Sequence, residues 1–429
     1  ALDSRADGLH ELSLRVLHLL ALLPVPAQRE DAPRAHPPLL EERRRHLRHV
    51  CHRDLPPRLP RLTPCPTTPH QRCVSQIGGQ AGNIGRNMVL ASKNIPESVP
   101  GTSVDRQCGS SQQAIHFAAQ AVMSGVQDVV IAAGVEHMSS TPIGSNVRDG
   151  MMARKSNLSL PLNEAINEKY GKRLEERGLT MFSQFEGAEI LAENYNITRK
   201  EMDESAVASH AKALHATKQG YFKREIVPLM GKDKQGNDVV HDTDEGIRPN
   251  TNMAGLSKLK DIKSRGKGKG MITAGLASQI CDGAAAILIC NARGLKKLGV
   301  QPRARICALA VAGDDPVQML GGPIPATKKA LAQVNMTMKQ MDLYEVNEAF
   351  ASVPLAWVKA LGADTKKLNV NGGAMALGHP LGGTGAKLMV TLLHEMERRG
   401  SKYGIQAICE GGGTANATII ERLPTGSKM

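Results

Sequence analysis

After residue 73, apolar and polar positions alternate between the two periods expected of an α/β protein. A helix of small residues is predicted for "SSQQAIHFAAQAVMSG", and Gly125 closes it in the position that glycine favours after a helix. A buried strand is predicted next, because "DVVIAAGVE" is a continuous apolar run. Farther along, residues 199–219 are predicted to form a more polar helix.

A similar order recurs near the end of the chain. A helix is predicted for "GGTGAKLMVTLLHEMERRG", followed by the strands "GIQAICEGGG" and "ANATIIERL". A potentially reactive residue precedes the small-residue helix in both copies, Cys108 in the first and His379 in the second. This repetition predicts two homologous halves, residues 73–290 and 291–429, although a βαβ order in any α/β protein can imitate it.

Two segments do not fit the repeated pattern. About residues 138–268 are more polar and irregular, which predicts a loop domain inserted into the first half. Residues 1–72 contain no Lys, Phe, Tyr, Trp, Ile, Met or Asn, but hold 7 of the 14 His and 11 of the 24 Pro. Three interpretations of this anomalous segment stay open: a helix from about Leu9 to Leu23, a disordered basic extension, and the translation of a wrong reading frame or mis-joined exon, which we favour.

Composition and charge limit the classes of protein. A chain of 429 residues is long enough for two domains with their own cores, and it has no apolar run of the roughly 18 residues that span a bilayer. The net charge of +13 indicates either a basic surface or attraction of a polyanion, such as a nucleotide-bearing cofactor. Few aromatic residues are available to stack on nucleic-acid bases, and the eight Cys have no zinc-ligand spacing.

Cys108 and His379 are the strongest candidates for chemistry. Cys108 lies in "DRQCGSS", directly before a helix, where the helix dipole is expected to lower the pKa of a thiol. His379 lies in "NGGAMALGHPLGGTGAK", where glycines allow the ring to approach a second reactive group. A buried structural cysteine and a turn histidine without a catalytic role are the alternatives.

Three further candidates are less specific. Cys409 and Gly411 lie in "CEGGGTAN", where a glycine turn exposes backbone N–H groups that can receive an oxyanion. Asn347 lies in "YEVNEAFAS", which also reads simply as the beginning of a helix.

Together, these motifs resemble the thiolase family. "DRQCGS", "NEAFA", "NGGAMALGHPLGGTGA" and "CEGGGTANA" occur in that order, and "ITAGLASQICDGAAA" is a fifth matching block. The resemblance covers about residues 73–429 and fails over residues 1–72, where a thiolase normally carries its first strand. It implies a five-layered αβαβα fold, an acyltransferase activity on coenzyme A thioesters, and a homodimer or homotetramer.

The resemblance also implies a role for each candidate. Cys108 would be the nucleophile that carries the acyl group, His379 would take its proton, and Cys409 would be the acid or base at the α-carbon. One oxyanion site would use His379 with a water held by Asn347, and the other would use the N–H groups of Cys108 and Gly411.

Substrate contacts follow from the same resemblance. Ser278 would contact the pantetheine arm of coenzyme A, and Arg248 would contact its nucleotide end. Coenzyme A and acyl-coenzyme A are then substrates, and neither a metal nor a redox cofactor is required. The acyl chain length and the biosynthetic or degradative direction are not indicated by these motifs.

Two other classes remain open as alternatives. A condensing enzyme of the ketoacyl-synthase type also uses a cysteine at a helix start, but it would lack the second cysteine in "CEGGG". An inactive coenzyme A-binding or scaffold protein would keep the fold without turnover.

The last three residues bear on location. Ser427, Lys428 and Met429 differ by one residue from the S-K-L address that directs proteins to the peroxisome. Peroxisomal import is therefore one expectation, with the mitochondrion and the cytoplasm as alternatives.

Overall fold

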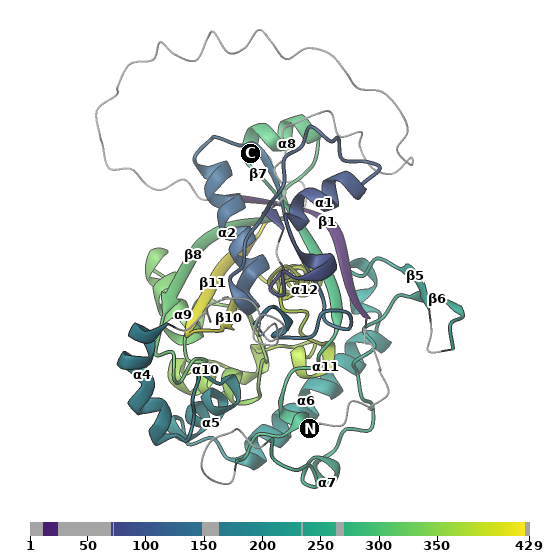
Figure 1. Cartoon of the computed structure of the whole chain (residues 1–429). Helices are drawn as coiled ribbons and strands as arrows, with labels where there is room; N and C mark the ends of the chain where they lie inside the picture. The colour runs from purple at the N-terminus through teal and green to yellow at the C-terminus, as the bar shows by residue number, and fades with distance from the viewer. Residues whose placement is uncertain are drawn as a thin grey trace.

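The computed structural model describes residues 73–147, 163–232, 235–262 and 270–424, together with the backbone of residues 12–24 and 70–71. Over these residues the α/β class predicted from the sequence is confirmed, since strands and helices alternate along the chain (Figure 1). Ser427, Lys428 and Met429 lie outside the described residues.

Nine strands of the described residues form one mixed sheet in the order β3-β2-β4-β7-β1-β8-β11-β10-β9. β4 and β7 are antiparallel, as are β8 and β11, and β10 is paired antiparallel with β11 and parallel with β9. In sheet order the strands are β3 (Thr102–Ser103), β2 (His70–Gln71), β4 (Val129–His137), β7 (Asp282–Cys290), β1 (Leu12–Pro24), β8 (Ala304–Gly313), β11 (Thr414–Arg422), β10 (Tyr403–Glu410) and β9 (Leu343–Val346).

The possible helix from about Leu9 to Leu23 is wrong where the chain is described. Leu12–Pro24 is the strand β1, which pairs in parallel with β7 and β8. An apolar run of this length fits a buried strand as well as a helix, and backbone pairing with two distant strands decides between them. The boundaries predicted for the two halves, the inserted domain and the anomalous segment stay predictions.

Two central helices, α2 (Ser110–Met123) and α12 (Thr384–Arg399), confirm both small-residue helices predicted from the sequence. They pack against each other and against strands of both halves (Figure 1). Along β4, Val130 and Ala132 face this central layer, whereas Val129 and Ile131 face α8 (Ala292–Leu298) on the other side. Because successive side chains point to opposite faces of the sheet, both faces of β4 are buried.

A second core covers the outer face of β8 and β11. It is formed with α9 (Pro323–Gln333), α10 (Ser352–Leu361) and α5 (Gln184–Asn194). The buried Trp357 indole donates to Thr327 Oγ1 at 2.9 Å, which satisfies the one polar group that its burial would otherwise leave unpaired.

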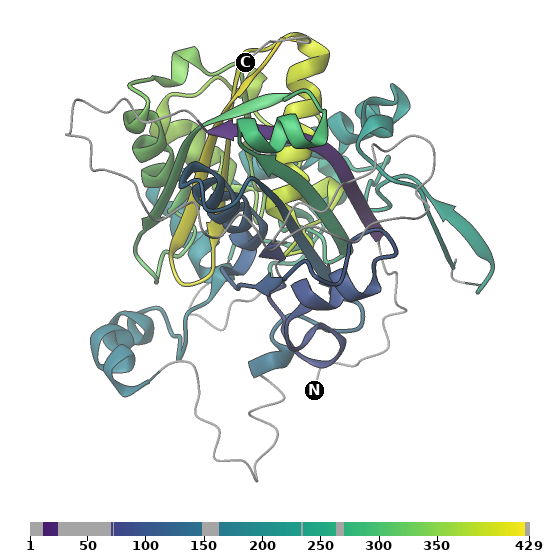
Figure 2. The same cartoon turned by 90° about the horizontal axis from the view of Figure 1, so that it is seen from above.

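The polar segment predicted as an insertion contains several elements. α6 (Arg199–Lys218) confirms the helix predicted for 199–219, and it begins with a capping box between Thr198 and Glu201. The hairpin of β5 (Leu229–Lys232) and β6 (Asp238–His241) projects from the body in both views (Figures 1 and 2). The remaining helices are α1 (Ile84–Ala91), α4 (Glu164–Glu176), α7 (Met253–Leu256) and α11 (Ala374–Leu377).

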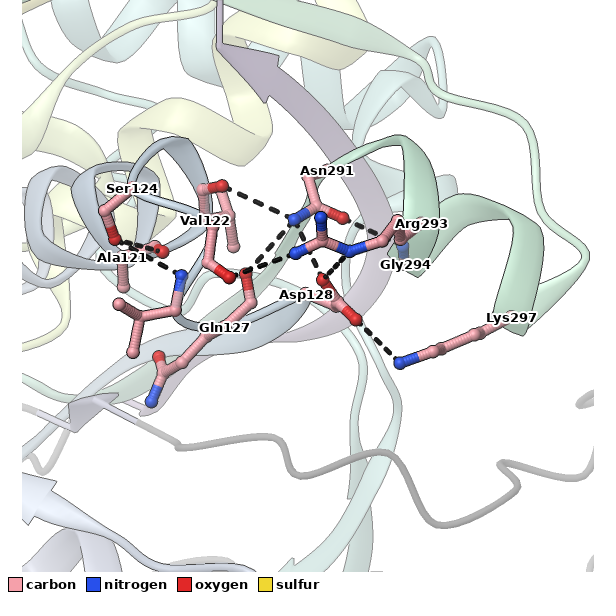
Figure 3. Close-up of polar contacts among 11 residues, drawn as sticks. Ala121, Val122, Ser124, Gln127, Asp128, Asn291, Arg293, Gly294 and Lys297 are labelled. Atoms are coloured by element: carbon pink, nitrogen blue, oxygen red, sulfur yellow. Dashed lines mark hydrogen bonds and ion pairs between the residues drawn. The ribbon is translucent and has the colours of Figure 1, made fainter. Parts of the chain in front are cut away.

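A charged cluster ties the beginning of β4 to α8. The Asp128 carboxylate accepts hydrogen bonds from Asn291 Nδ2 at 3.0 Å, Arg293 Nε at 2.8 Å and Lys297 Nζ at 2.6 Å (Figure 3). Burial alone would favour the neutral acid, but the hydrogen bonds from Lys297, Asn291 and Arg293 outweigh it and lower the pKa of Asp128 to about 2.

Within the part of the chain that the structure describes, no helix is both long and apolar enough to cross a lipid bilayer.

Candidate active site

Cys108 lies at the beginning of α2, inside the short 3₁₀ turn Gln107–Gly109. Gln107 has a left-handed φ of 49°, and its N–H donates to Asp105 Oδ1 at 2.7 Å, which supports this unusual backbone. The half-buried Cys108 side chain packs against a buried cluster of Val74, Met138 and Leu381, and Leu381 lies two residues after His379. The packing brings together the two loops that the sequence predicted to carry the chemistry.

The pKa of Cys108 differs from the sequence prediction. Desolvation, followed by the negative charge of Glu410 and smaller contributions from Glu136 and Asp105, raises the pKa of this thiol to about 12. The prediction that the helix start lowers the pKa is therefore wrong for the protein without substrate, because burial and nearby carboxylates outweigh the favourable backbone. Cys108 is a protonated thiol at neutral pH and needs a base to become a nucleophile.

His379 lies between α11 and α12, and the backbone around it is tightly constrained. Gly378 has a φ of 76°, and a Cβ there would come within 2.5 Å of Cys281 Sγ. The N–H of His379 donates to Gln279 O at 3.0 Å. Only glycine suits position 378, and the imidazole that follows it is buried.

The hydrogen bonds of His379 indicate which ring nitrogen carries the proton. Thr384 Oγ1 donates to Pro380 O at 2.9 Å, so it accepts from His379 Nδ1 at 2.6 Å. Nε2 is then the free base, and it accepts from Asn347 Nδ2 at 3.3 Å. Burial, with a smaller effect of Lys387, lowers the pKa of His379 to about 3, so the ring is neutral at pH 7.

Asn347 directly follows β9, and its N–H donates to Ala407 O on β10 at 3.0 Å. The buried Asn347 Oδ1 has no hydrogen-bond partner among the described residues. Asn347 therefore presents an amide group to His379 on one side and an available acceptor on the other. The helix α10 begins at Ser352, the last residue of the motif that contains Asn347, so Asn347 itself precedes the helix.

Glu348, the next residue, connects Asn347 to the His379 loop. Its buried carboxylate accepts from Ser209 Oγ at 2.7 Å, Asn369 Nδ2 at 3.0 Å and the N–H of Met375 at 3.2 Å. Burial raises the pKa of Glu348 despite these hydrogen bonds. The carboxylate joins β9, α6 and the segment before His379 into one rigid support.

Cys409 is the second cysteine of the site and lies near the end of β10 with only 1% of its surface exposed. Burial, and next the neighbouring Cys108, raises the pKa of Cys409 well above its ordinary value. Gly411 follows in the turn to β11, and a Cβ at this position would lie 3.1 Å from Gln107 Oε1. The β10–β11 turn therefore contacts the Cys108 loop directly.

A buried acid at the end of β4 holds two further loops in place. Glu136 accepts from the N–H groups of Val74 at 2.8 Å, Ser75 at 3.0 Å and Gly382 at 3.0 Å. Gly382 belongs to the loop that carries His379. Glu136 was not among the residues predicted from the sequence, because its partners lie up to 246 residues away along the chain.

The two predicted substrate-contact residues lie close to each other. Arg248 lines a cavity of about 480 Å³ together with His210 and Asn252, and its guanidinium donates to Gln279 Oε1 at 3.4 Å. Gln279 also accepts from the backbone of His379, and Ser278 directly precedes it. Gln279 thus links the cavity to His379, a role for which the sequence carried no signal.

The described residues contain no group of three or more His, Cys, Asp or Glu side chains arranged to hold a metal ion.

Comparisons with known proteins agree with this arrangement. The family model "Thiolase, N-terminal domain" matches residues 72–293, and "Thiolase, C-terminal domain" matches residues 300–422. The steroid 3-ketoacyl-CoA thiolase FadA6 of Mycobacterium tuberculosis is 48% identical over 355 residues, which cover 82% of each chain. A 3-ketoacyl-CoA thiolase of Cronobacter sakazakii is 41% identical and covers 82% of this chain and 86% of its own.

Solved structures show the same likeness. The Bacillus anthracis acetyl-CoA acetyltransferase has a TM-score of 0.72 and 38% identity, covering 85% of this chain and 88% of its own. Human mitochondrial 3-ketoacyl-CoA thiolase has a TM-score of 0.72 and 34% identity, covering 85% and 89%. The chain belongs to the thiolase family. It is an acyltransferase with the two-domain α/β thiolase fold, as the sequence motifs predicted.

Proposed function

We propose that the chain transfers an acyl group between coenzyme A and an acetyl-CoA carbon through an acyl-Cys108 intermediate. In thiolysis, Cys108 Sγ attacks the 3-keto carbon, the bond between C2 and C3 breaks, and acetyl-CoA leaves. The thiol of coenzyme A then attacks the Cys108 thioester and releases the shortened acyl-CoA; condensation is the reverse. One observation carries the proposal: the Cys108 loop packs against the loop that holds Leu381, close to His379, and lies beside Cys409 and the turn that follows it.

The protonation states support a division of labour between the first two residues. Cys108 is a protonated thiol with a pKa of about 12, and His379 is a neutral imidazole whose Nε2 is a free base. His379 takes the thiol proton as the acyl group is attacked, and the resulting imidazolium stabilises the negative charge next to it.

The carbon–carbon step needs a separate proton donor. Cys409 gives its proton to the departing enolate in thiolysis, or removes one from acetyl-CoA in condensation. Charge on the thioester oxygen is stabilised at two places: by His379 with a water held at Asn347, and by the backbone N–H groups of Cys108 and Gly411. The available Asn347 Oδ1 supports such a water.

Coenzyme A enters this scheme as a substrate. Arg248 gives the cavity beside it a positive charge suited to the phosphates of coenzyme A, and Gln279 connects Arg248 to His379. Ser278 directly precedes Gln279 in the chain, and its assignment to the pantetheine arm is supported by the resemblance to thiolases. No metal or redox cofactor takes part in any of the proposed steps.

Acyl transfer to Cys108 is tested with radiolabelled acetyl-CoA and peptide mapping. The Cys108 peptide is expected to carry the label in the wild type, Cys409→Ala is expected to retain labelling but lose condensation, and Cys108→Ala is expected to lose both. Cys307→Ala is the matched control, because Cys307 is also half-buried with a pKa raised to about 12 but lies on β8. Label on a residue other than Cys108 contradicts the proposal.

Assembly and location are further parts of the proposal. A homodimer or homotetramer is supported by the resemblance to thiolases, and light scattering coupled to size-exclusion chromatography measures it directly. Peroxisomal import is supported by Ser427, Lys428 and Met429. A fluorescent reporter carrying the last ten or so residues is expected to be punctate in a eukaryotic cell, and diffuse fluorescence that is unchanged by removing the final three residues contradicts the import.

A further inference from the structure

An ion pair joins the two loops that carry the cysteines. Arg106, two residues before Cys108, donates from Nε to Glu410 Oε2 at 2.8 Å, and Glu410 directly follows Cys409. The two residues are 304 positions apart in the chain. Thr414 Oγ1 donates to the same carboxylate oxygen at 2.7 Å, which fixes Glu410 across the β10–β11 pair.

The local packing is shaped around the Glu410 side chain, which is fully buried, whereas Arg106 retains 28% exposure. A Cβ at position 109 would lie 1.8 Å from Glu410 Oε1, so the carboxylate occupies the space of a side chain next to Cys108. Gly109 has a φ of −90°, which any residue adopts. Glycine is therefore required at position 109 by the presence of Glu410, and backbone conformation does not explain it.

Glu410 has the largest effect among the charges around the Cys108 thiol. Glu136 from β4 and Asp105 from the same loop also raise the pKa of Cys108, but by less than Glu410 does. Glu136 accepts hydrogen bonds from backbone N–H groups, and Asp105 accepts one from Gln107. Glu410 instead forms an ion pair with Arg106, whose guanidinium carries a full positive charge. Cys409 is the other titratable group nearby, and Glu410 contributes to raising its pKa too.

We infer that Arg106 and Glu410 are a positioning pair for both cysteines. Glu410 holds the Cys108 loop against the turn that follows Cys409, and Arg106 neutralises the carboxylate so that a thiolate can form beside it. This inference rests on the proposed function only in taking Cys108 as the nucleophile. The pair touches neither substrate nor the reacting atoms in the proposed steps and acts through the thiols.

The test measures the reactivity of the Cys108 thiolate with iodoacetamide, a neutral probe, across a range of pH. The rate for Cys108 is followed by mass spectrometry of its peptide. Arg106→Gln leaves the Glu410 charge unbalanced and is expected to lower the rate about tenfold at a given pH, whereas Glu410→Gln is expected to raise it about tenfold. Arg106→Lys keeps the charge and is expected to restore most of the wild-type rate.

Rate changes of opposite sign in the Arg106 and Glu410 variants would distinguish this role from simple damage to the fold. A purely structural pair would move both variants in the same direction, and that result, or no change in either variant, overturns the inference. Arg177→Gln and Glu186→Gln are matched controls, because that pair is similarly buried at 2.6 Å but lies on other elements. Acetyl-CoA labelling of wild-type Cys108 is measured separately, so a failure of the proposed function is distinguished from a failure of this inference.

Discussion

The two ends of β4 each carry an acid, and the two acids are used differently. Asp128, just before the strand, is held by the exposed side chains of Arg293 and Lys297 (Figure 3). Glu136, near the other end, is fully buried and accepts hydrogen bonds from backbone N–H groups of two separate loops. Flexible cations at the first end can be replaced by water, whereas backbone amides at the second end have no other partner.

The difference fits the proposed location of the chemistry at the Glu136 end of β4. A buried carboxylate that gathers backbone amides fixes where loops lie, and the Gly382 loop positions His379. A surface cluster stabilises the junction between a strand and a helix without fixing a reacting group. The following predictions change one end at a time.

The largest expected effect is a loss of turnover when a residue at the Glu136 end of β4 is changed. His379→Ala removes the base of the proposed mechanism, and kcat is expected to fall by about 10²–10⁴-fold. Steady-state assays of thiolysis, with circular dichroism to verify folding, measure the change. Asp128→Ala is the control at the opposite end and is expected to retain near-normal kcat; equal losses in both variants would remove the functional distinction between the ends.

Glu136→Ala is expected to reduce both stability and activity. The N–H groups of Val74, Ser75 and Gly382 would lose their shared acceptor, and a buried unpaired N–H costs about 1–3 kcal/mol. A loss of at least about 3 kcal/mol in the free energy of unfolding is expected, measured by denaturant titration. A variant as stable as the wild type would show that these amides find other partners.

Asp128 should contribute stability that depends on pH. Its pKa is lowered to about 2 in the folded protein, so the contribution is complete above the unfolded value near 3.8 and is lost as the pH falls through about 2. The full contribution is about 2 kcal/mol. The difference in thermal midpoint between the wild type and Asp128→Asn is expected to be constant from pH 7 to about 5 and to shrink below pH 4. A difference that grows on acidification contradicts the assignment.

Lys297→Ala is expected to have the smallest effect. Lys297 is 48% exposed, and Asp128 keeps Arg293 and Asn291 as partners after the change. The expected loss is below about 1 kcal/mol, and it should diminish further in high salt. Thermal unfolding at low and high ionic strength measures both.

Local patterns predicted the elements of the site better than its electrostatics. The helices α2 and α12 and the strands β4 and β10 follow from apolar periodicity and from glycines within a few residues. Cys108, His379 and Cys409 were predicted as site residues because their motifs are contiguous in the sequence.

What the sequence missed depends on long-range contacts. The sign of the pKa change at Cys108 was wrong because the fold buries the thiol, and because Glu410 and Glu136 from other strands add negative charge near it. β1 was not predicted as a strand because its apolar run has no local signal that distinguishes a strand from a helix, and pairing with β7 and β8 decides it. Gln279 and Glu136 have roles only through partners that the sequence does not place beside them.

The separation of Arg106 and Glu410 along the chain also has a consequence during synthesis on the ribosome. Arg106 emerges early, but its partner Glu410 is added 304 residues later. Closing so long a loop is entropically unfavourable until the intervening segments have folded. The nascent first half therefore exposes an incomplete site, and the reactive centre is assembled only after β10 has been translated and docked.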